Sequence, residues 1–281
     1  MQLANEQILE LQRTEKEIFE AFIEVCEKLN IKYYLLAGTL LGAVRHQGFI
    51  PWDDDIDVGI MREDYELFLK EAGKLLPEHL FLQTYKTDEE YPRVFAKIRN
   101  SNSTFIETAV KDNKMNHGLY IDVFPLDRCD PQKRYSFGFR TKEKIYSMRS
   151  SSLMKNYKLD LRRRLIRVLC MLVCPSANKA LRKMEALYTS MPDGGCVVNF
   201  SGIYGEREVM PLDWYGEGAM LSFEGLTVTA PKEYEKWLTQ VYGDYMSLPP
   251  VEKRVTHHFT EKIDVNTPYE VYCNTSIWRK G

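Results

Sequence analysis

The sequence lacks several features that mark common classes of protein. It has no run of eighteen apolar residues, so we expect no membrane-spanning helix. Its six cysteines are scattered, and neither they nor the five histidines show the spacing of a zinc site. The first residues are polar rather than a secretory signal, which favours a cytoplasmic protein with reduced thiols. Length and composition agree with a soluble enzyme. Because no nucleic-acid-binding module is recognisable, we expect the chain to bind no nucleic acid.

Charge is distributed unevenly along the chain. The 281 residues are 44% hydrophobic, which is enough for a sizeable core, and the net charge is -2. Residues 128–184 nevertheless contain sixteen Lys or Arg and three acidic residues, a net charge of +13, which leaves −15 for the rest. Such a contrast indicates a separate subdomain or a functional surface.

Four aspartates lie within five positions: Asp53, Asp54, Asp55 and Asp57. Carboxylates this close repel one another, so a fold that gathers them must neutralise them with cations. The alternation of Asp55 and Asp57 with apolar residues predicts a half-buried strand, on which Asp53, Asp55 and Asp57 share one face. Hard oxygen ligands at this spacing suit Mg²⁺, which binds few protein carboxylates and leaves its other positions to water and phosphate.

Three other interpretations of the acids fit the sequence less well. An EF-hand beginning at Asp53 would need glycine where Val58 stands and glutamate where Asp64 stands. A solvated acidic loop would not need apolar residues alternating with the acids. Acids also favour helix N-termini, but Glu63 and Asp64 are better placed for that role.

A predicted strand, turn and helix precede the acids. The apolar run over residues 33–36 ends at Gly38 and Thr39, and the helix-prone stretch from Leu40 to Arg45 follows. Gly38 permits close approach to a ligand, Thr39 supplies a hydroxyl and a helix cap, and the first helical amides attract phosphate. An ordinary capped helix is the alternative, but the acids that follow make the pattern more specific.

The run from Leu36 to Val58 resembles the LicD family, which includes the fukutin-type transferases of the nucleotidyltransferase-fold superfamily. That superfamily has Gly-Ser/Thr on a turn and Asp-x-Asp/Glu on the next strand, here Gly38-Thr39 and Asp55 to Asp57. The resemblance continues over residues 96–99, 118–127 and 242–246, and so covers most of the chain. It implies an α+β nucleotidyltransferase-like fold with a mixed sheet flanked by helices.

The same resemblance implies roles for individual acids. Asp55 and Asp57 would hold Mg²⁺ (or Mn²⁺), with Asp122 as a third carboxylate from a neighbouring strand and as the base for the acceptor proton. Asp122 stands in an apolar run, where an unpaired charge is costly. A turn residue is the alternative, and it suits Asp127 better. Asp53 would belong to the metal site as a residue that orients a ligand or a water.

The implied reaction moves a phosphorylated head group, often phosphocholine, from a CDP-linked donor such as CDP-choline to a glycan or lipid-linked saccharide acceptor, releasing CMP. A nucleotidyltransferase that releases pyrophosphate is one alternative. A non-catalytic binding module is another, although it would be expected to have lost acids that are all present here.

Residues expected to bind the donor or acceptor are Gly38, Thr39, Arg45, His46, Trp52, Lys97 and His257. Lys97 and Arg45 are candidates for phosphate contacts, and solvated surface charge is an equal alternative. Trp52 would stack on a base or on the choline cation, or else pack in the core. We expect only one histidine position, His46 or the His257-His258 pair, to contact an anionic group.

We divide the chain into a nucleotidyltransferase-like catalytic core (1–127), a basic helical insertion (128–192) and a C-terminal part that completes the core and site (193–281). Predicted helices cover residues 5–29, 39–46 and 63–75, with basic helices within 131–190 and a further helix opened by Pro231. Predicted strands cover 33–36, 55–61 and 222–229, and lie near 79–85, 93–99 and 118–124.

Residues 160–174 combine a basic beginning with an apolar body too short to cross a bilayer. Such a segment is able to lie on an anionic membrane at the inner face of the plasma membrane. A core helix with a charged first turn is the alternative that we favour, because apolar helical stretches usually bury within the protein.

Overall fold

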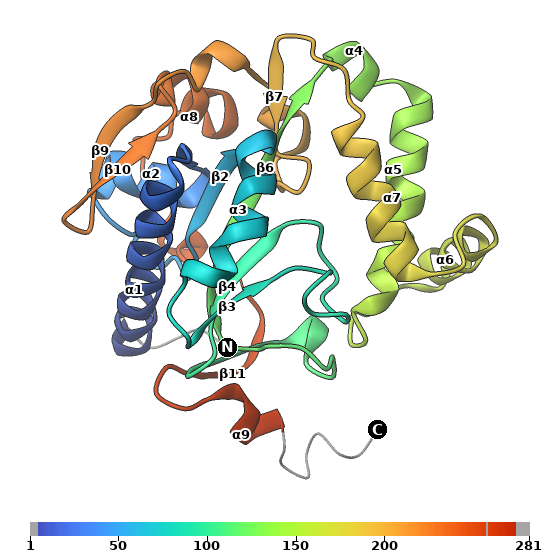
Figure 1. Cartoon of the computed structure of the whole chain (residues 1–281), viewed down its shortest axis with the longest axis horizontal. Coiled ribbons are helices and arrows are strands. Elements are labelled where there is room, and N and C mark those ends of the chain that lie inside the picture. The colour runs from blue at the N-terminus through green and yellow to red at the C-terminus, as the bar shows by residue number, and fades with distance from the viewer. Residues whose placement is uncertain (1–4, 257, 274–281) are drawn as a thin grey trace.

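The computed structural model describes residues 5–256 and 258–273, and it shows an α+β protein whose mixed sheet is flanked by helices, as expected (Figure 1). The central strands run in the order β1-β2-β6-β4-β3. Their bounds are β1 Tyr33–Leu35, β2 Asp57–Met61, β6 Leu119–Cys129, β4 Ala96–Asn100 and β3 Leu80–Gln83. Strands β7 (Cys196–Val198) and β8 (Met210–Pro211) extend the sheet from the far end of β6.

One parallel pair at the centre of the described sheet sets its geometry. Strand β2 runs parallel to β6, whereas β1 pairs with β2, and β4 with β6, in the antiparallel sense. The register places Asp57 opposite Asp122, and Lys97 on the other side of Asp122. Residues directly opposite one another point to the same face of a sheet. Three charged side chains therefore form a row across three strands.

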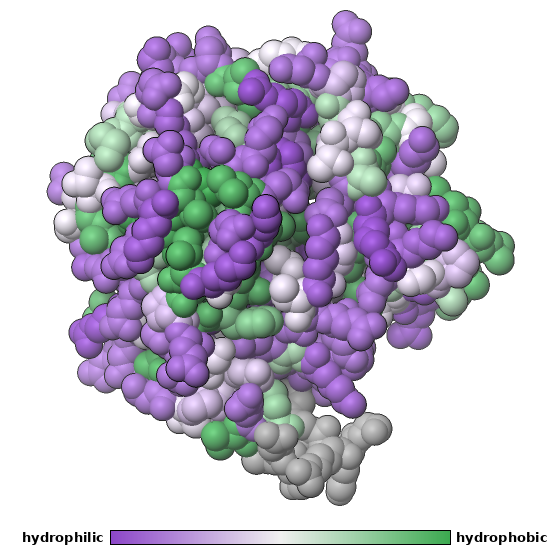
Figure 2. All heavy atoms as spheres, in the orientation of Figure 1, coloured by the Kyte–Doolittle hydropathy of each residue, from purple (hydrophilic) through white to green (hydrophobic). Residues whose placement is uncertain are grey.

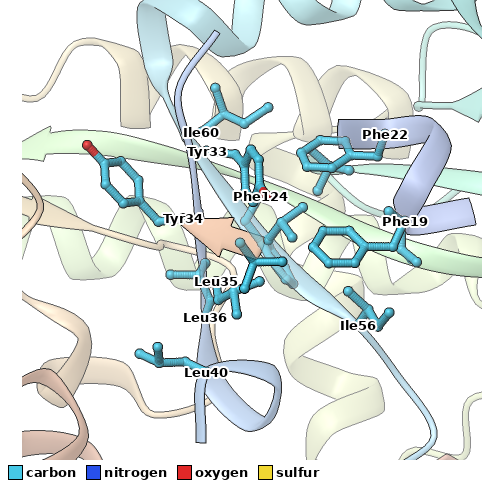
Figure 3. Packing of buried hydrophobic residues seen from close by; sticks show 14 of the residues in the cluster. Phe19, Phe22, Tyr33, Tyr34, Leu35, Leu36, Leu40, Ile56, Ile60 and Phe124 are labelled. Carbon is cyan, nitrogen blue, oxygen red and sulfur yellow. The ribbon is translucent and has the colours of Figure 1, made fainter. Parts of the chain in front are cut away.

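Helix α1 (Asn5–Leu29) covers the sheet beside α3 (Arg62–Leu75). Its apolar face carries Phe19 and Phe22, which pack on Tyr33 with ring centroids 6.0 and 5.2 Å away (Figure 3). Phe22 also meets Phe68 of α3 at 5.5 Å. Because these rings are almost fully excluded from water, truncating one of them is expected to cost about 3–5 kcal/mol.

Several predicted boundaries are wrong in informative ways. Helix α2 (Ala37–His46) begins two residues before Thr39, so Thr39 is not its cap. Strand β2 begins at Asp57, so the three preceding aspartates lie in a loop rather than on a strand face.

Two predictions in the C-terminal part also differ from the structure. The segment 222–229, predicted as one strand, belongs to a hairpin of β9 (Ala219–Phe223) and β10 (Leu226–Ala230), whose turn residues Glu224 and Gly225 both have positive φ. Helix α8 (Tyr234–Tyr242) begins after Pro231, which lies outside its first turn.

Two segments that are far apart in the sequence form a separate two-stranded sheet. Strand β5 (Thr104–Glu107) pairs with β11 (Thr260–Asp264), and α9 (Tyr269–Cys273) follows. This pairing brings the C-terminal segment next to the central sheet. All six cysteines lie within the described residues and are free, and no described helix is long and apolar enough to span a membrane.

The basic segment forms four helices to one side of the sheet (Figure 1). They are α4 (Pro131–Arg134), α5 (Phe137–Ser150), α6 (Leu161–Val173) and α7 (Ala177–Thr189). The core helix that we favoured for residues 160–174 is wrong. Of the fully described residues of α6, Cys170 alone is buried, because the apolar face of the helix points away from the protein.

Candidate functional site

Three successive aspartates gather in the loop before β2. One carboxylate oxygen from each of Asp53, Asp54 and Asp55 lies within 4.8 Å of the others. Asp53 and Asp54 are buried, and Asp55 is partly buried. This set includes Asp54, which the sequence analysis did not select, since strand alternation would have turned it to the opposite face. Asp57 and Asp122 lie next to this group in the charged row of the sheet.

A glycine makes room for the first of these acids. A Cβ atom built on Gly38 would lie 2.5 Å from Oδ2 of Asp53, so any larger residue there would displace the carboxylate. On the other side, the Gln12 side chain donates to the carbonyl of Asp53 (2.9 Å) and to that of Ile50 (3.3 Å). Gln12 of α1 thus holds the loop that carries the acids, and Gly38 of α2 leaves space for its first carboxylate.

Thr39 positions the start of β2. Its hydroxyl accepts a hydrogen bond from the backbone amide of Asp57 at 2.8 Å. The Gly-Thr motif therefore serves the acids directly in this structure: Gly38 accommodates Asp53 and Thr39 fixes the backbone of Asp57. The hydrogen bond from Asp57 thus links the first turn of α2 to the first residue of β2.

Lys97 neutralises Asp122. Its ammonium lies 2.9 Å from Oδ1 of Asp122 and 3.2 Å from the centroid of the Tyr120 ring, and it is only 4% exposed. Burial lowers the pKa of Lys97, although the charge of Asp122 acts in the opposite direction. The ammonium that we expected to contact phosphate is thus paired with a carboxylate. The position of Asp122 within β6 also excludes the turn alternative.

Asp127, which we assigned to a turn, is likewise inside β6. Its two carboxylate oxygens accept hydrogen bonds from Arg62 at 2.7 and 2.8 Å. This buried two-fold contact ties the first residue of α3 to the sheet. The turn assignment for Asp127 is therefore wrong.

His258 reaches the acids from the C-terminal segment. Its Nδ1 lies 3.2 Å from Oδ1 of Asp54. Burial alone would lower its pKa, but the hydrogen bond to Asp54 and the charges of Asp55 and Asp54 outweigh burial and raise the pKa to about 9. His258 is therefore a second cation at the cluster. The predicted residue, His257, lies outside the described residues, and the sequence offered no basis for choosing its neighbour.

Glu15 of α1 adds a further acid. It is 1% exposed, and within the described part of the chain its Oε2 atom has no hydrogen-bond partner. Burial, followed by the charges of Asp55 and Asp54, raises its pKa well above the ordinary value. Sequence analysis missed Glu15 because it lies in a helix far ahead of the acidic motif.

The charge balance at the site favours a cation. The acids are Glu15, Asp53, Asp54, Asp55, Asp57 and Asp122, and the nearby cations are Lys97 and His258. Burial and mutual repulsion raise the pKa of Asp53 and Asp57 well above the ordinary value. The donor set consists of oxygen atoms, and the buried Oε2 of Glu15 has no hydrogen-bond partner among the described residues, so the residues fit Mg²⁺ or Mn²⁺.

The remaining predicted residues meet each other and the C-terminal segment. Arg45 donates to the carbonyl of Tyr245 (2.9 Å) and to Nε2 of His46 (3.0 Å). Trp52 is partly buried, its ring centroid is 6.4 Å from that of His46, and the guanidinium of Arg254 lies 5.4 Å over it. Their contacts with a donor remain predictions.

Two tyrosines that the sequence analysis did not select border the acids. The hydroxyl of Tyr204 donates to that of Tyr242 at 2.9 Å. Burial raises the pKa of both, and the charge of Asp57 acts in the same direction. Tyr242 opens a stretch that we had matched to the family, but no spacing in the sequence linked it to Asp57.

Comparisons with known proteins point to one family of transferases. Residues 30–164 match the family model described as LicD/FKTN/FKRP, nucleotidyltransferase domain. The chain is 29% identical over 251 residues to the lipopolysaccharide cholinephosphotransferase LicD of Haemophilus influenzae, which covers 87% of this chain and 93% of that protein. It is also 36% identical over 86 residues to the human ribitol 5-phosphate transferase FKRP, covering 29% of this chain and 17% of that protein.

The family match and the named relatives indicate a phosphotransferase with a nucleotidyltransferase domain, and the mixed sheet is consistent with that domain. More particularly, residues 30–164 resemble the LicD family, and the chain over most of its length is similar to LicD.

Proposed function

We propose that this enzyme uses a divalent cation to move phosphocholine, or a similar phosphorylated head group, from a CDP-linked donor such as CDP-choline. The acceptor is a hydroxyl of a cell-surface glycan or of its lipid-linked precursor, and CMP is released. The names of the relatives support a head group that contains phosphate. The observation that carries the proposal is the meeting of Asp53, Asp54 and Asp55 beside the row formed by Asp57 and Asp122.

The proposed cation ligands come from the acidic loop and the two parallel strands. Asp53, Asp54 and Asp55 offer oxygens close enough to share an ion, and Asp57 and Asp122 extend the oxygen surface. When bound, Mg²⁺ or Mn²⁺ neutralises the charge of the donor diphosphate and of its leaving group. Because Asp53, Asp54 and Asp122 are buried and Asp55 and Asp57 are partly buried, water screens charge only weakly at this site.

The protein's own groups supply the proton transfer and the positioning. In the proposed step, the acceptor oxygen forms a bond to the head-group phosphorus while the bond from phosphorus to the oxygen of CMP breaks. The proton of the acceptor hydroxyl passes to a carboxylate, for which Asp122 is our candidate. Lys97 balances the charge of Asp122 and fixes its position, and Thr39 fixes the backbone of Asp57.

The proposal places the enzyme in the cytoplasm, in contact with the inner face of the plasma membrane. Six free cysteines, four of them buried, support a reducing compartment. The membrane contact is argued separately below.

The nature of the released product tests the reaction. The purified protein is incubated with Mg²⁺ and a glycolipid fraction from the organism that naturally makes this protein. Labelled CDP-choline, CDP-ribitol or CTP is added to separate samples. We expect CMP from one CDP-linked donor, with the label transferred to the glycolipid and the reaction abolished by a chelator. Pyrophosphate released from CTP alone would identify a nucleotidyltransferase instead. Binding of a donor without turnover would identify a binding module.

A pair of matched variants links that reaction to the site. Asp55→Asn removes one charge from the acidic loop, whereas Asp213→Asn makes the same change at an exposed position. We expect the first variant to lose more than about 99% of CMP release while remaining folded, because metal-centred charge neutralisation supplies much of the catalysis. The second should retain the activity of the wild type.

A further inference from the structure

Helix α6 presents an apolar face to solvent. Leu161, Leu165, Val168 and Leu172 are spaced by four, three and four residues, so they lie along one side of the helix. Leu165 is 60% exposed and Leu172 is 82% exposed. Further exposed apolar side chains on this helix are Leu169, Met171 and Val173. Figure 2 shows hydrophobic atoms at the edge of the molecule where α6 lies in Figure 1.

The opposite side of α6 is attached to the protein. Cys170 follows Leu161 by two and a half helical turns and is buried. At the C-terminal end of the helix, the guanidinium of Arg149 donates to the carbonyls of Cys174 (3.0 Å) and Pro175. At the other end, Asp160 caps the helix by accepting a hydrogen bond from the amide of Arg163. The burial of Cys170 and the contacts of Arg149 hold this side of α6 against the protein, so the apolar side faces outward.

Positive charge accompanies the apolar face. Arg162, Arg163 and Arg164 are all exposed, and Arg167 is partly exposed. Asp160 is the single acid among residues 160–174, so this segment has a net charge of +3 within a region of +13. Seven exposed apolar side chains on one helix are unusual for a surface that contacts only water. Arginines beside this apolar stripe complement an anionic partner.

The length of α6 determines how it would meet a bilayer. Thirteen residues at about 1.5 Å each give a helix of roughly 20 Å, shorter than the roughly 30 Å of a hydrocarbon core. A helix with these features lies in the plane of the interface, with its apolar side among the acyl chains and its cations among the headgroups.

We propose that α6 docks the enzyme on an anionic lipid bilayer by inserting its apolar stripe, while its arginines contact lipid phosphates. This inference goes beyond the proposed reaction, because it depends on the surface of α6 and not on the acids. It also supplies a physical reason for a membrane location in a chain with no described helix able to span the bilayer.

Vesicle flotation tests the proposal with the full-length chain. Vesicles of phosphatidylcholine alone are compared with vesicles that contain one quarter phosphatidylglycerol. We expect wild-type protein to float with the anionic vesicles and to be largely released from them by high salt. For the double variant Leu165→Gln/Leu172→Gln, we expect the affinity for anionic vesicles to fall by roughly tenfold or more, because two inserted side chains are lost. Arg162→Gln/Arg163→Gln should lose binding to anionic vesicles several-fold.

Controls separate docking from folding and from catalysis. Leu9 is 61% exposed on α1, so Leu9→Gln removes a comparable apolar side chain elsewhere and should leave flotation unchanged. The double leucine variant should keep the unfolding midpoint of the wild type and its ability to release CMP from donor in detergent solution. Loss of CMP release in the wild type would count against the reaction and leave the docking result intact.

Three outcomes would overturn the docking proposal. The first is that wild-type protein stays unbound in the presence of anionic vesicles. The second is that the double leucine variant binds these vesicles as well as the wild type does. The third is that the wild type is a dimer in solution that the double leucine variant converts to monomers. In that case a second copy of the chain, and not lipid, covers the stripe.

Discussion

Asp57 of β2 lies directly opposite Asp122 of β6 on the neighbouring parallel strand, so two acids share one face of the sheet. Lys97 continues the row on the far side of Asp122 and makes the ion pair described above. The acidic loop joins this row from the start of β2. Strand register therefore brings together acids that are separated by more than sixty residues in the sequence.

Replacing Lys97 should destabilise the metal-free protein. Lys97→Met keeps the length of the side chain but leaves Asp122 without its buried partner. Loss of one member of a buried pair typically costs about 3–5 kcal/mol. We expect the free energy of unfolding in urea, measured with a chelator present, to fall by about that amount, and Mg²⁺ to restore part of it. Lys142→Met, at an exposed position, is the control; an equal effect of the two substitutions would contradict the assigned role of Lys97.

Adding one methyl group at Gly38 should disturb the metal site. The new Cβ of Gly38→Ala would displace the Asp53 carboxylate, so we expect Mn²⁺ affinity to fall by about tenfold or more. Gly73 offers a matched control, because a Cβ there has no atom within 4 Å and the residue lies inside α3. Gly73→Ala should raise the free energy of unfolding by about 0.5–1 kcal/mol and leave Mn²⁺ affinity unchanged. Calorimetric titration of both variants distinguishes these results.

Removing His258 should weaken the attachment of the C-terminal segment. The hydrogen bond between His258 and the Asp54 carboxylate involves a charged group, for which a contribution of about 1.5–3 kcal/mol is typical. We expect His258→Ala to lower the free energy of unfolding by that amount. His79→Ala, at an exposed position, should change it by less than about 0.5 kcal/mol. Equal stability of the two variants would show that the contact with Asp54 contributes nothing.

Glu208 should make stability depend on pH. Burial raises its pKa from 4.5 to about 7, even though the amide of Tyr204 donates to its carboxylate at 2.8 Å. The folded state thus holds this proton more tightly than the unfolded state, so the contribution of Glu208 is full below pH 4.5 and is lost as pH rises through 7. Relative to Glu208→Gln, the wild type should lose up to about 3 kcal/mol across this range.

Urea titrations at several pH values measure that difference. The exposed Glu206 provides the control, because the difference between wild type and Glu206→Gln should stay nearly constant with pH. A constant difference for Glu208→Gln as well would show that the buried carboxyl keeps its ordinary pKa.

Local sequence patterns predicted many of the helices and strands. Helix α1 was predicted with the observed bounds because its apolar residues recur at helical spacing, and β1 followed from its short aromatic run. The hairpin of β9 and β10 was missed because its apolar and polar residues alternate on both sides of the turn at Glu224. In α6 the periodicity indicated an amphipathic helix, but it carried no information on which way the apolar side faces.

The site was predictable only in part. Asp55 and Asp57 stand in a local motif, and the apolar surroundings of Asp122 indicated an acid with a partner. Glu15 and His258 reach the same place through the packing of α1 and of the C-terminal segment, which no local pattern encodes. Asp54 was passed over because we assumed a regular strand where the structure has a loop.

Direct measurement of Mn²⁺ binding tests the central claim, that the clustered acids hold a divalent cation. We expect calorimetry to show stoichiometric binding to the wild type, competition by Mg²⁺, and a loss of affinity of about 100-fold in folded Asp55→Asn protein. No binding to the wild type, or equal affinity in Asp55→Asn, would contradict this account.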